Sequence, residues 1–87
     1  MMIFGNKRSE VEIIHKLLSL SEQDIKKTNL MYKTNLCYPL FNKYLNFLLE
    51  NDFLNKRSND GNGQTFFITK KGKNVLDKTT SLLEEFS

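Results

Sequence analysis

The stretch from Lys26 to Arg57 constrains the fold more than any other part of the chain. It contains a short helical pattern, a break at Thr34–Asn35, and a longer amphipathic pattern that starts near Pro39. Asn tolerates the left-handed backbone that ends many helices, and Pro suits a first helical turn because its missing N–H would be unpaired there. The sequence therefore predicts two helices joined by a tight turn and followed directly by a strand.

The longer of these helices has one strongly apolar face. Its large side chains recur at intervals of three and four residues, which predicts that they face a core: Phe41, Tyr44, Leu45 and Leu48. We expect this helix to end near Glu50, before Asn51–Asp52. The preceding short helix is expected from Asn29 to Lys33, with Thr28 as its N-cap.

The N-terminal part predicts a further core helix. Ser9 begins a capping box with Glu12, and an apolar stripe follows. We expect residues 1–8 to form a loose arm before this helix. Ile25 is expected to be the buried residue of a short strand.

The C-terminal part predicts a hairpin and a last helix. The first hairpin strand starts at Phe53, Ser58–Gln64 supplies the Gly and Asn of a turn, and Thr65–Thr69 is a β-branched and aromatic return strand. Thr69 is then expected to cap the last helix.

These elements together predict an α+β fold that is mainly α. The architecture is a winged helix-turn-helix with a three-helix core, a two-stranded wing hairpin and a C-terminal helix. Eighty-seven residues suffice for one small core. We divide the chain into an N-terminal arm (1–8), the winged helix-turn-helix domain (9–69) and a C-terminal helix (70–87) that is the expected dimerisation element.

Positive charge is concentrated in the middle of the chain. From Lys26 to Lys73, eight Lys and one Arg oppose three acids, which gives a net charge of +6. The remaining residues carry four cations and seven acids, a net charge of −3. A basic surface on the helix-turn-helix half favours a polyanionic partner such as double-stranded DNA.

The candidate DNA-binding residues lie on three elements. The polar arc of helix 38–50 carries Tyr38, Asn42, Lys43 and Asn46, and Asn and Lys are residue types that contact base edges and phosphates. From the arc alone, an ordinary solvated face is as good an interpretation; the turn before the helix and the basic hairpin favour DNA. The others flank the short helix, lie on the wing or begin the last helix: Lys27, Thr28, Lys33, Lys56, Arg57, Lys70 and Lys71.

Nothing in the sequence predicts an enzyme. His15 has no metal-ligand spacing around it, and the single Cys37 can form neither a zinc site nor an internal disulfide. We therefore expect no catalytic residue, metal or small-molecule cofactor. The lack of long apolar runs predicts no membrane contact, and the single Cys favours a cytoplasmic location.

The chain resembles the small archaeal winged-helix DNA-binding proteins. The motifs that carry the resemblance are Lys27-Thr28, Met31-Tyr32, Asn35-Leu36, Tyr38, Tyr44-Leu45 and Thr69-Lys70-Lys71-Gly72. Cys37 departs from the family pattern, which has Ser, a better N-cap, at this position. The resemblance implies a homodimer formed by C-terminal helices, with Leu76, Thr79, Leu83 and Phe86 as the expected contact residues. The alternative is that this helix folds back on its own domain.

The leading hypothesis is therefore a homodimeric transcriptional regulator that binds double-stranded DNA. It would insert helix 38–50 into the major groove and place the wing on the adjacent backbone or minor groove. Two alternatives stay open: a protein-interaction module of the same fold, and an architectural protein that coats DNA without sequence preference.

Overall fold

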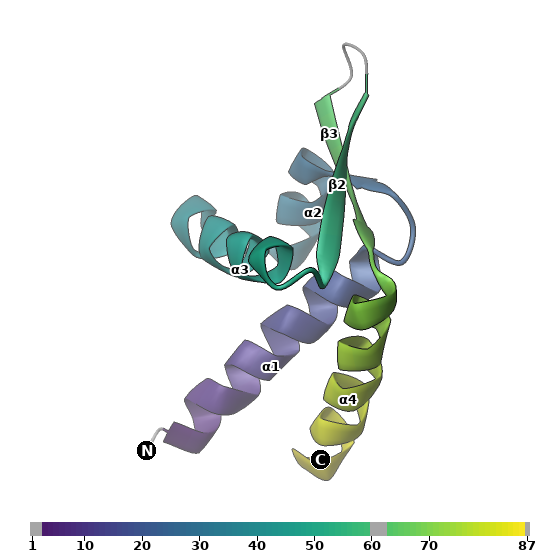
Figure 1. Ribbon diagram of the computed structural model, residues 1–87. Coiled ribbons are helices and arrows are strands. Elements are labelled where there is room, and N and C mark those ends of the chain that lie inside the picture. Colours follow the sequence, from purple (N-terminus) through teal and green to yellow (C-terminus); the bar gives the residue numbers. More distant parts are fainter. Residues whose placement is uncertain (1–2, 60–62, 87) are drawn as a thin grey trace.

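The fold places four helices around a small antiparallel sheet in the computed structural model (Figure 1). The structure describes residues 3–59 and 63–86. The elements in chain order are α1 (Ile3–Leu20), β1 (Ile25–Lys26), α2 (Lys27–Thr34), α3 (Tyr38–Glu50), β2 (Leu54–Asn59), β3 (Gly63–Ile68) and α4 (Lys70–Phe86). This order confirms the predicted winged helix-turn-helix architecture.

The sheet has the strand order β1-β3-β2, with both neighbouring pairs antiparallel. Phe66 of β3 lies opposite Ile25 on one side, which confirms Ile25 as the residue of the short strand that packs inward. The hairpin strands are longer than expected, because β2 continues to Asn59 and β3 begins at Gly63. The centre of the expected turn, residues 60–62, lies outside the described residues.

One hydrophobic core joins the sheet to all four helices. On α3, Phe41, Leu45 and Leu48 are almost fully buried at the predicted spacing. Around them pack the other buried apolar residues: Leu17, Leu18, Leu30, Leu54, Phe66, Ile68 and Leu76. The phase of this packing fixes which face of α3 stays in solvent.

The wing hairpin has a free edge along β2. The backbone N–H of Lys56 on this strand donates a hydrogen bond to Oδ1 of the neighbouring Asn55 at 2.8 Å. The Asn55 side chain thus accepts the hydrogen bond of one backbone N–H group of its own strand.

Thr69 caps α4, as predicted. Its Oγ1 accepts a hydrogen bond from the N–H of Gly72 at 2.9 Å, and its own N–H donates to the carbonyl of Phe53 at 3.1 Å. Gly72 is buried and lies so close to Phe53 that a Cβ at this position would be 2.0 Å from the Phe53 carbonyl oxygen. The start of α4 is therefore locked onto the turn that follows α3.

Two predicted helix starts are wrong. Helix α1 begins at Ile3, so residues 3–8 continue the helix rather than form an arm, and residues 1–2 lie outside the described residues. An N-cap residue must have extended backbone, and Lys26 supplies it at φ −70° and ψ 148°, because β1 runs straight into α2. Thr28 therefore lies inside the first turn of α2 and does not cap it.

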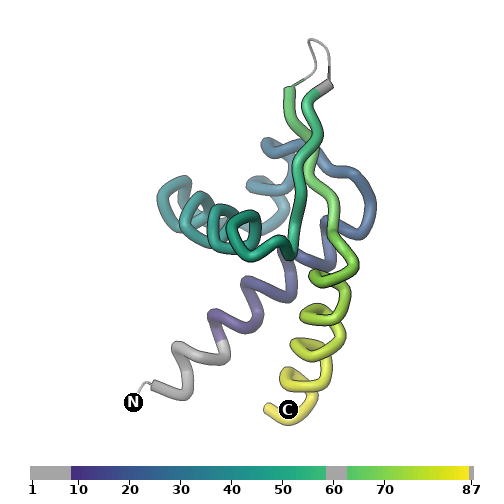
Figure 2. Tube along the Cα trace, in the orientation of Figure 1, coloured from purple at the N-terminus to yellow at the C-terminus, as the bar shows by residue number. Residues whose placement is uncertain are grey.

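Helix α4 packs against α1 below the sheet (Figure 2). Leu76 and Thr79 are buried in this contact, at 8% and 9% exposure. Oγ1 of Thr79 donates to the carbonyl of Leu76 at 2.9 Å and lies 3.2 Å from Nδ1 of His15. Since the hydroxyl has one hydrogen, His15 is the donor in its contact with Thr79. Two of the four expected dimer residues thus face their own subunit, because the apolar stripe of α4 completes the core.

Candidate nucleic-acid interface

The turn between α2 and α3 is set by one left-handed residue. Asn35 has φ 57° and ψ 36°, and its N–H bonds to the carbonyls of Met31 at 3.1 Å and Tyr32 at 3.3 Å. Oγ1 of Thr34 donates to the Met31 carbonyl at 2.9 Å. These bonds end α2 as predicted and direct the chain into α3.

The N-terminus of α3 is open. Cys37 is the N-cap residue with extended backbone, φ −66° and ψ 156°, but its side chain makes no capping hydrogen bond. The thiol-bearing residue is exposed. Pro39 lies in the first turn, where it lacks a donor in any case. The expectation that Cys37 caps poorly is confirmed, because its side chain bonds to none of the first-turn N–H groups.

The polar arc of α3 lies in solvent beside this N-terminus. Tyr38 is 55% exposed, Lys43 and Asn46 are exposed, and Asn42 is half-buried. Nζ of Lys27, at the start of α2, lies 5.9 Å from the centre of the Tyr38 ring, a cation–π distance. This contact joins the start of α2 to the polar arc of α3, and we call the combined surface the α3 face: Lys27, Tyr38, Asn42, Lys43 and Asn46.

Helix α2 adds an exposed aromatic residue that the sequence analysis gave no role. Tyr32 is 85% exposed, at the rim of a surface hollow that Thr28 and Lys33 also line. Leu30 is fully buried two positions earlier, so a helical period of 100° per residue sends Tyr32 to the opposite side. That phase was readable from the sequence once Leu30 was assigned to the core.

The two wing cations lie on opposite faces of the sheet. Directly paired residues share a face, and Lys56 pairs with the buried Phe66 whereas Arg57 pairs with Thr65. Lys56 is exposed on the face that turns toward the helices. The guanidinium of Arg57 stacks over the Phe67 ring at 4.6 Å and forms an ion pair with Asp24. Arg57 therefore has intramolecular partners that Lys56 lacks among the described residues.

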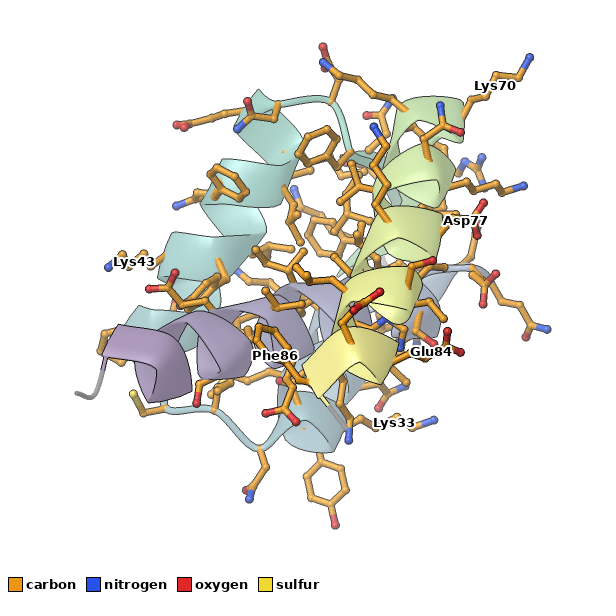
Figure 3. All side chains as sticks on the ribbon, turned by 90° about the horizontal axis from the view of Figure 1, so that it is seen from below. Lys33, Lys43, Lys70, Asp77, Glu84 and Phe86 are labelled. Carbon is orange, nitrogen blue, oxygen red and sulfur yellow. The ribbon has the colours of Figure 1, made fainter. Side chains whose placement is uncertain are left out.

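The two cations at the start of α4 lie away from the α3 face. Figure 3 shows Lys43 and Lys70 on opposite sides of the molecule. Nζ of Lys71 lies 5.4 Å from the Phe53 ring, and that ring packs edge-to-face with Phe47 at 6.2 Å. The structure thus places Lys71 beside the C-terminal end of α3. It does not bring Lys70 together with Lys43, although the sequence analysis grouped both with the DNA-binding cations.

One ionisable group near this surface is perturbed. Burial raises the pKa of the Tyr44 hydroxyl, and the negative charge of Glu10 on α1 raises it further. Tyr44 is half-buried between the exposed and the buried faces of α3. It is neutral at physiological pH and packs against the core on the side of α3 that faces α1.

Two further features of the described residues concern metal ligands and membrane spans. Within residues 3–59 and 63–86, no three His, Cys, Asp or Glu side chains gather as metal ligands would. In the same part of the chain, no helix has the length and apolar character that crossing a membrane requires.

Two proteins of Methanocaldococcus jannaschii are similar to the chain in sequence. Uncharacterized protein MJ0287 is 35% identical over 79 residues, which cover 90% of this chain and 76% of that protein. Uncharacterized protein MJ0290 is 36% identical over 73 residues, which cover 83% of this chain but 32% of that protein. This chain thus spans about a third of the length of MJ0290.

Several solved structures share the fold. Sso10a-2, a DNA-binding protein from Sulfolobus solfataricus, superposes with a TM-score of 0.77 at 24% identity, over 85% of this chain and 77% of that one. A MarR-family transcriptional regulator from Silicibacter pomeroyi gives 0.75 at 12% identity, over 95% and 65%. SSV1 F-93 gives 0.68 at 21% identity, over 87% and 88%.

The family model for winged helix-turn-helix proteins matches residues 7–86, nearly the whole chain. Its span includes every strand, the turn between α2 and α3, and the α3 face. The chain belongs to the winged helix-turn-helix family.

Proposed function

We propose that this chain is a transcriptional regulator that binds double-stranded DNA as a homodimer, in the compartment that holds the DNA, and has no enzymatic activity. Helix α3 enters the major groove and the wing contacts the adjacent backbone or minor groove. The observation that carries the proposal is the α3 face: polar and cationic side chains stand in solvent at the open N-terminus of a helix whose other face is buried. The DNA-binding protein Sso10a-2 has the same fold, which supports the proposal.

The residues of the α3 face divide into two roles. Asn42 and Lys43 are the candidates for base contacts, because an Asn amide pairs with adenine in two hydrogen bonds and Lys donates to guanine. Lys27 and Tyr38 act together, since the Tyr38 ring at the start of α3 holds the ammonium group of Lys27 at the start of α2. Their role is to contact phosphate and fix the register of the helix in the groove.

Selection of bound duplexes from a random library, read by sequencing, tests the proposal. A regulator enriches a defined motif, and its affinity for that motif falls steeply with salt because phosphate contacts release counterions. Uniform enrichment with dense coverage would identify a coat protein instead. No duplex binding at low salt would refute the proposal.

A matched pair of variants locates the interface. Asn42→Ala with Lys43→Ala is expected to erase the preference for the selected motif. Lys70→Ala removes a similar cation from the opposite side of the molecule and is expected to leave that preference intact. Equal effects of the two changes would contradict the assignment of the α3 face.

Two of the four residues first expected in the homodimer contact, Leu76 and Thr79, are not available for it. Since Leu76 and Thr79 are buried within the subunit, we propose that the last turns of α4, beyond Thr79, supply the contact. Leu82 is 43% exposed, Phe86 is 37% exposed and Leu83 is half-buried. Large exposed apolar side chains close together favour a protein partner, and a second copy of the chain is the partner that a regulator requires.

The same exposed residues favour one other function, a protein-interaction module. Phe47 on α3 is also 44% exposed, so two apolar areas are open to a partner. This function predicts that Leu82→Ser with Phe86→Ser abolishes binding to a partner protein. It also predicts that the wild-type chain enriches no sequence motif among duplexes.

A further inference from the structure

The ion pair between Arg57 and Asp24 links two segments that are 33 residues apart in the chain. Arg57 lies on the wing strand β2, and Asp24 lies in the connection between α1 and β1. Both side chains stay about half exposed, at 54% and 46%. The guanidinium lies 4.6 Å from the centre of the Phe67 ring, on the outer face of the sheet.

The carboxylate of Asp24 lies among more cations than acids. Asp24 lines a surface hollow together with Lys26, Asn29 and Lys33, and Glu22 is the other acid there. The strand register sets Lys26, Thr65 and Arg57 in one row across the sheet, so the outer face carries a cation on each side of Thr65. A carboxylate of the protein thus binds Arg57 in a hollow that Lys26 and Lys33 also line, and a phosphate group can bind the same guanidinium.

The energetics make this carboxylate replaceable. An ion pair this exposed to water contributes little stability, because water and salt screen it. Arg binds a phosphate through two parallel N–H donors, as it binds a carboxylate. A duplex brings many phosphates to the wing at once, whereas Asp24 offers one carboxylate.

We propose that Asp24 sets the affinity of the wing for DNA by competing with phosphate for Arg57. In the free protein Asp24 holds the guanidinium on the outer face of the sheet, and in the complex a backbone phosphate takes its place. Asp24 is therefore a positioning residue that acts through Arg57 and makes no favourable contact with DNA itself. This inference rests on the proposed DNA-binding function.

The test is a salt titration of duplex binding by fluorescence polarisation with five variants and the wild type: Asp24→Asn, Arg57→Gln, Glu22→Gln, and each of the two acid changes combined with Arg57→Gln. Asp24→Asn is expected to bind about two- to fivefold more tightly, because the free protein no longer has an ion pair to break. Arg57→Gln is expected to bind more weakly, with a salt slope lower by about one, the signature of one lost phosphate contact. In the double variant the gain from Asp24→Asn is expected to vanish. Thermal unfolding of each variant verifies that it is folded.

Glu22→Gln is the matched control, since it removes one negative charge from the same hollow without touching Arg57. Its gain in affinity is expected to be smaller and to persist when Arg57 is replaced. Three results would overturn the inference: weaker or unchanged binding by Asp24→Asn, an equal gain from Glu22→Gln, or a gain that survives Arg57→Gln. Weaker binding in particular would assign the ion pair a purely structural role in holding the wing. Absence of binding by the wild type would instead remove the proposed function, and this inference with it.

Discussion

Replacing Gly72 by Ala is expected to destabilise the protein strongly, although Ala is the better helix former. Gly72 is the third residue of α4 and lies against the turn that joins α3 to β2. An added Cβ would stand 2.0 Å from the carbonyl oxygen of Phe53 and 2.8 Å from Cγ1 of Ile68. Ordinary contact begins at 3.4 Å, so the start of α4 must move away by about 1.4 Å.

The cost follows from what that movement breaks. Overpacking of this kind costs about 1–3 kcal/mol. The movement also disrupts the 3.1 Å hydrogen bond from the Thr69 N–H to the Phe53 carbonyl, at a cost of about 1 kcal/mol. The higher helix propensity of Ala returns at most about 1 kcal/mol. The net loss in the free energy of unfolding is therefore about 1–3 kcal/mol, which lowers Tm by roughly 4–24 °C in a domain of this size.

Urea and thermal denaturation followed by circular dichroism measure this loss. Lys73→Ala is the control, because Lys73 is the next residue along α4 and is exposed. It is expected to change the stability by less than about 0.5 kcal/mol. A Gly72→Ala protein as stable as the wild type would refute the argument that backbone contact, rather than helix propensity, selects Gly at this position.

Three further predictions concern the cap, the pH dependence and the dimer. Thr69→Ala is expected to cost about 1–2 kcal/mol of unfolding free energy by chemical denaturation, because it removes the cap on Gly72, whereas Thr28→Ala, which removes no cap, is expected to be near neutral. The raised pKa of Tyr44 means that the folded state favours the neutral hydroxyl. The stability that this group contributes is present below its ordinary pKa of 10.0 and is lost as the pH rises through the raised pKa. Tyr44→Phe should therefore lose less stability than the wild type above about pH 10. The same fall of unfolding free energy with pH in both proteins would argue against this. Leu82→Ser with Phe86→Ser is expected to shift a dimer to a monomer in sedimentation equilibrium, while Lys78→Ala leaves it unchanged; a wild-type monomer at all concentrations would exclude this contact.

Local signals predicted most of the fold. Pro39 and Asn51 bracket α3, Asn35 supplies the left-handed turn, and Thr69 caps α4, and the structure has all four as expected. Each of these roles depends on a residue type with a strong local backbone or hydrogen-bonding preference. Such preferences are readable without knowing what lies nearby in space.

The failures share the opposite property. Thr28 is a good N-cap in isolation. Strand pairing at Ile25–Lys26, however, keeps Lys26 extended, so that Lys26 is the N-cap residue and α2 starts at Lys27. The apolar positions of α4 indicate that one face is buried, but not whether α1 or a second subunit buries it. For Leu76 and Thr79, α1 does so. These outcomes depend on tertiary packing, which single-sequence periodicity does not contain.

The candidate site was only partly predictable for the same reason. The exposure of Lys43 and Asn46 follows from the helical period once the core face of α3 is known. The position of Lys70 far from Lys43 follows from how α4 docks, and the contact of Arg57 with Asp24 crosses 33 residues of sequence. A count of cations by sequence position therefore overestimates how many of them share one surface.

The hydrogen bond from the Lys56 N–H to the Asn55 side chain has a consequence for the behaviour of the protein at high concentration. An open β-strand margin invites a strand of another molecule to add to it, and stacks of such additions grow into fibrous aggregates. On β2 the Asn55 side chain already satisfies one of the donors that an incoming strand needs, and the neighbouring exposed Lys56 repels an identical copy. The hairpin can therefore project from the body of the protein without acting as a template for self-association.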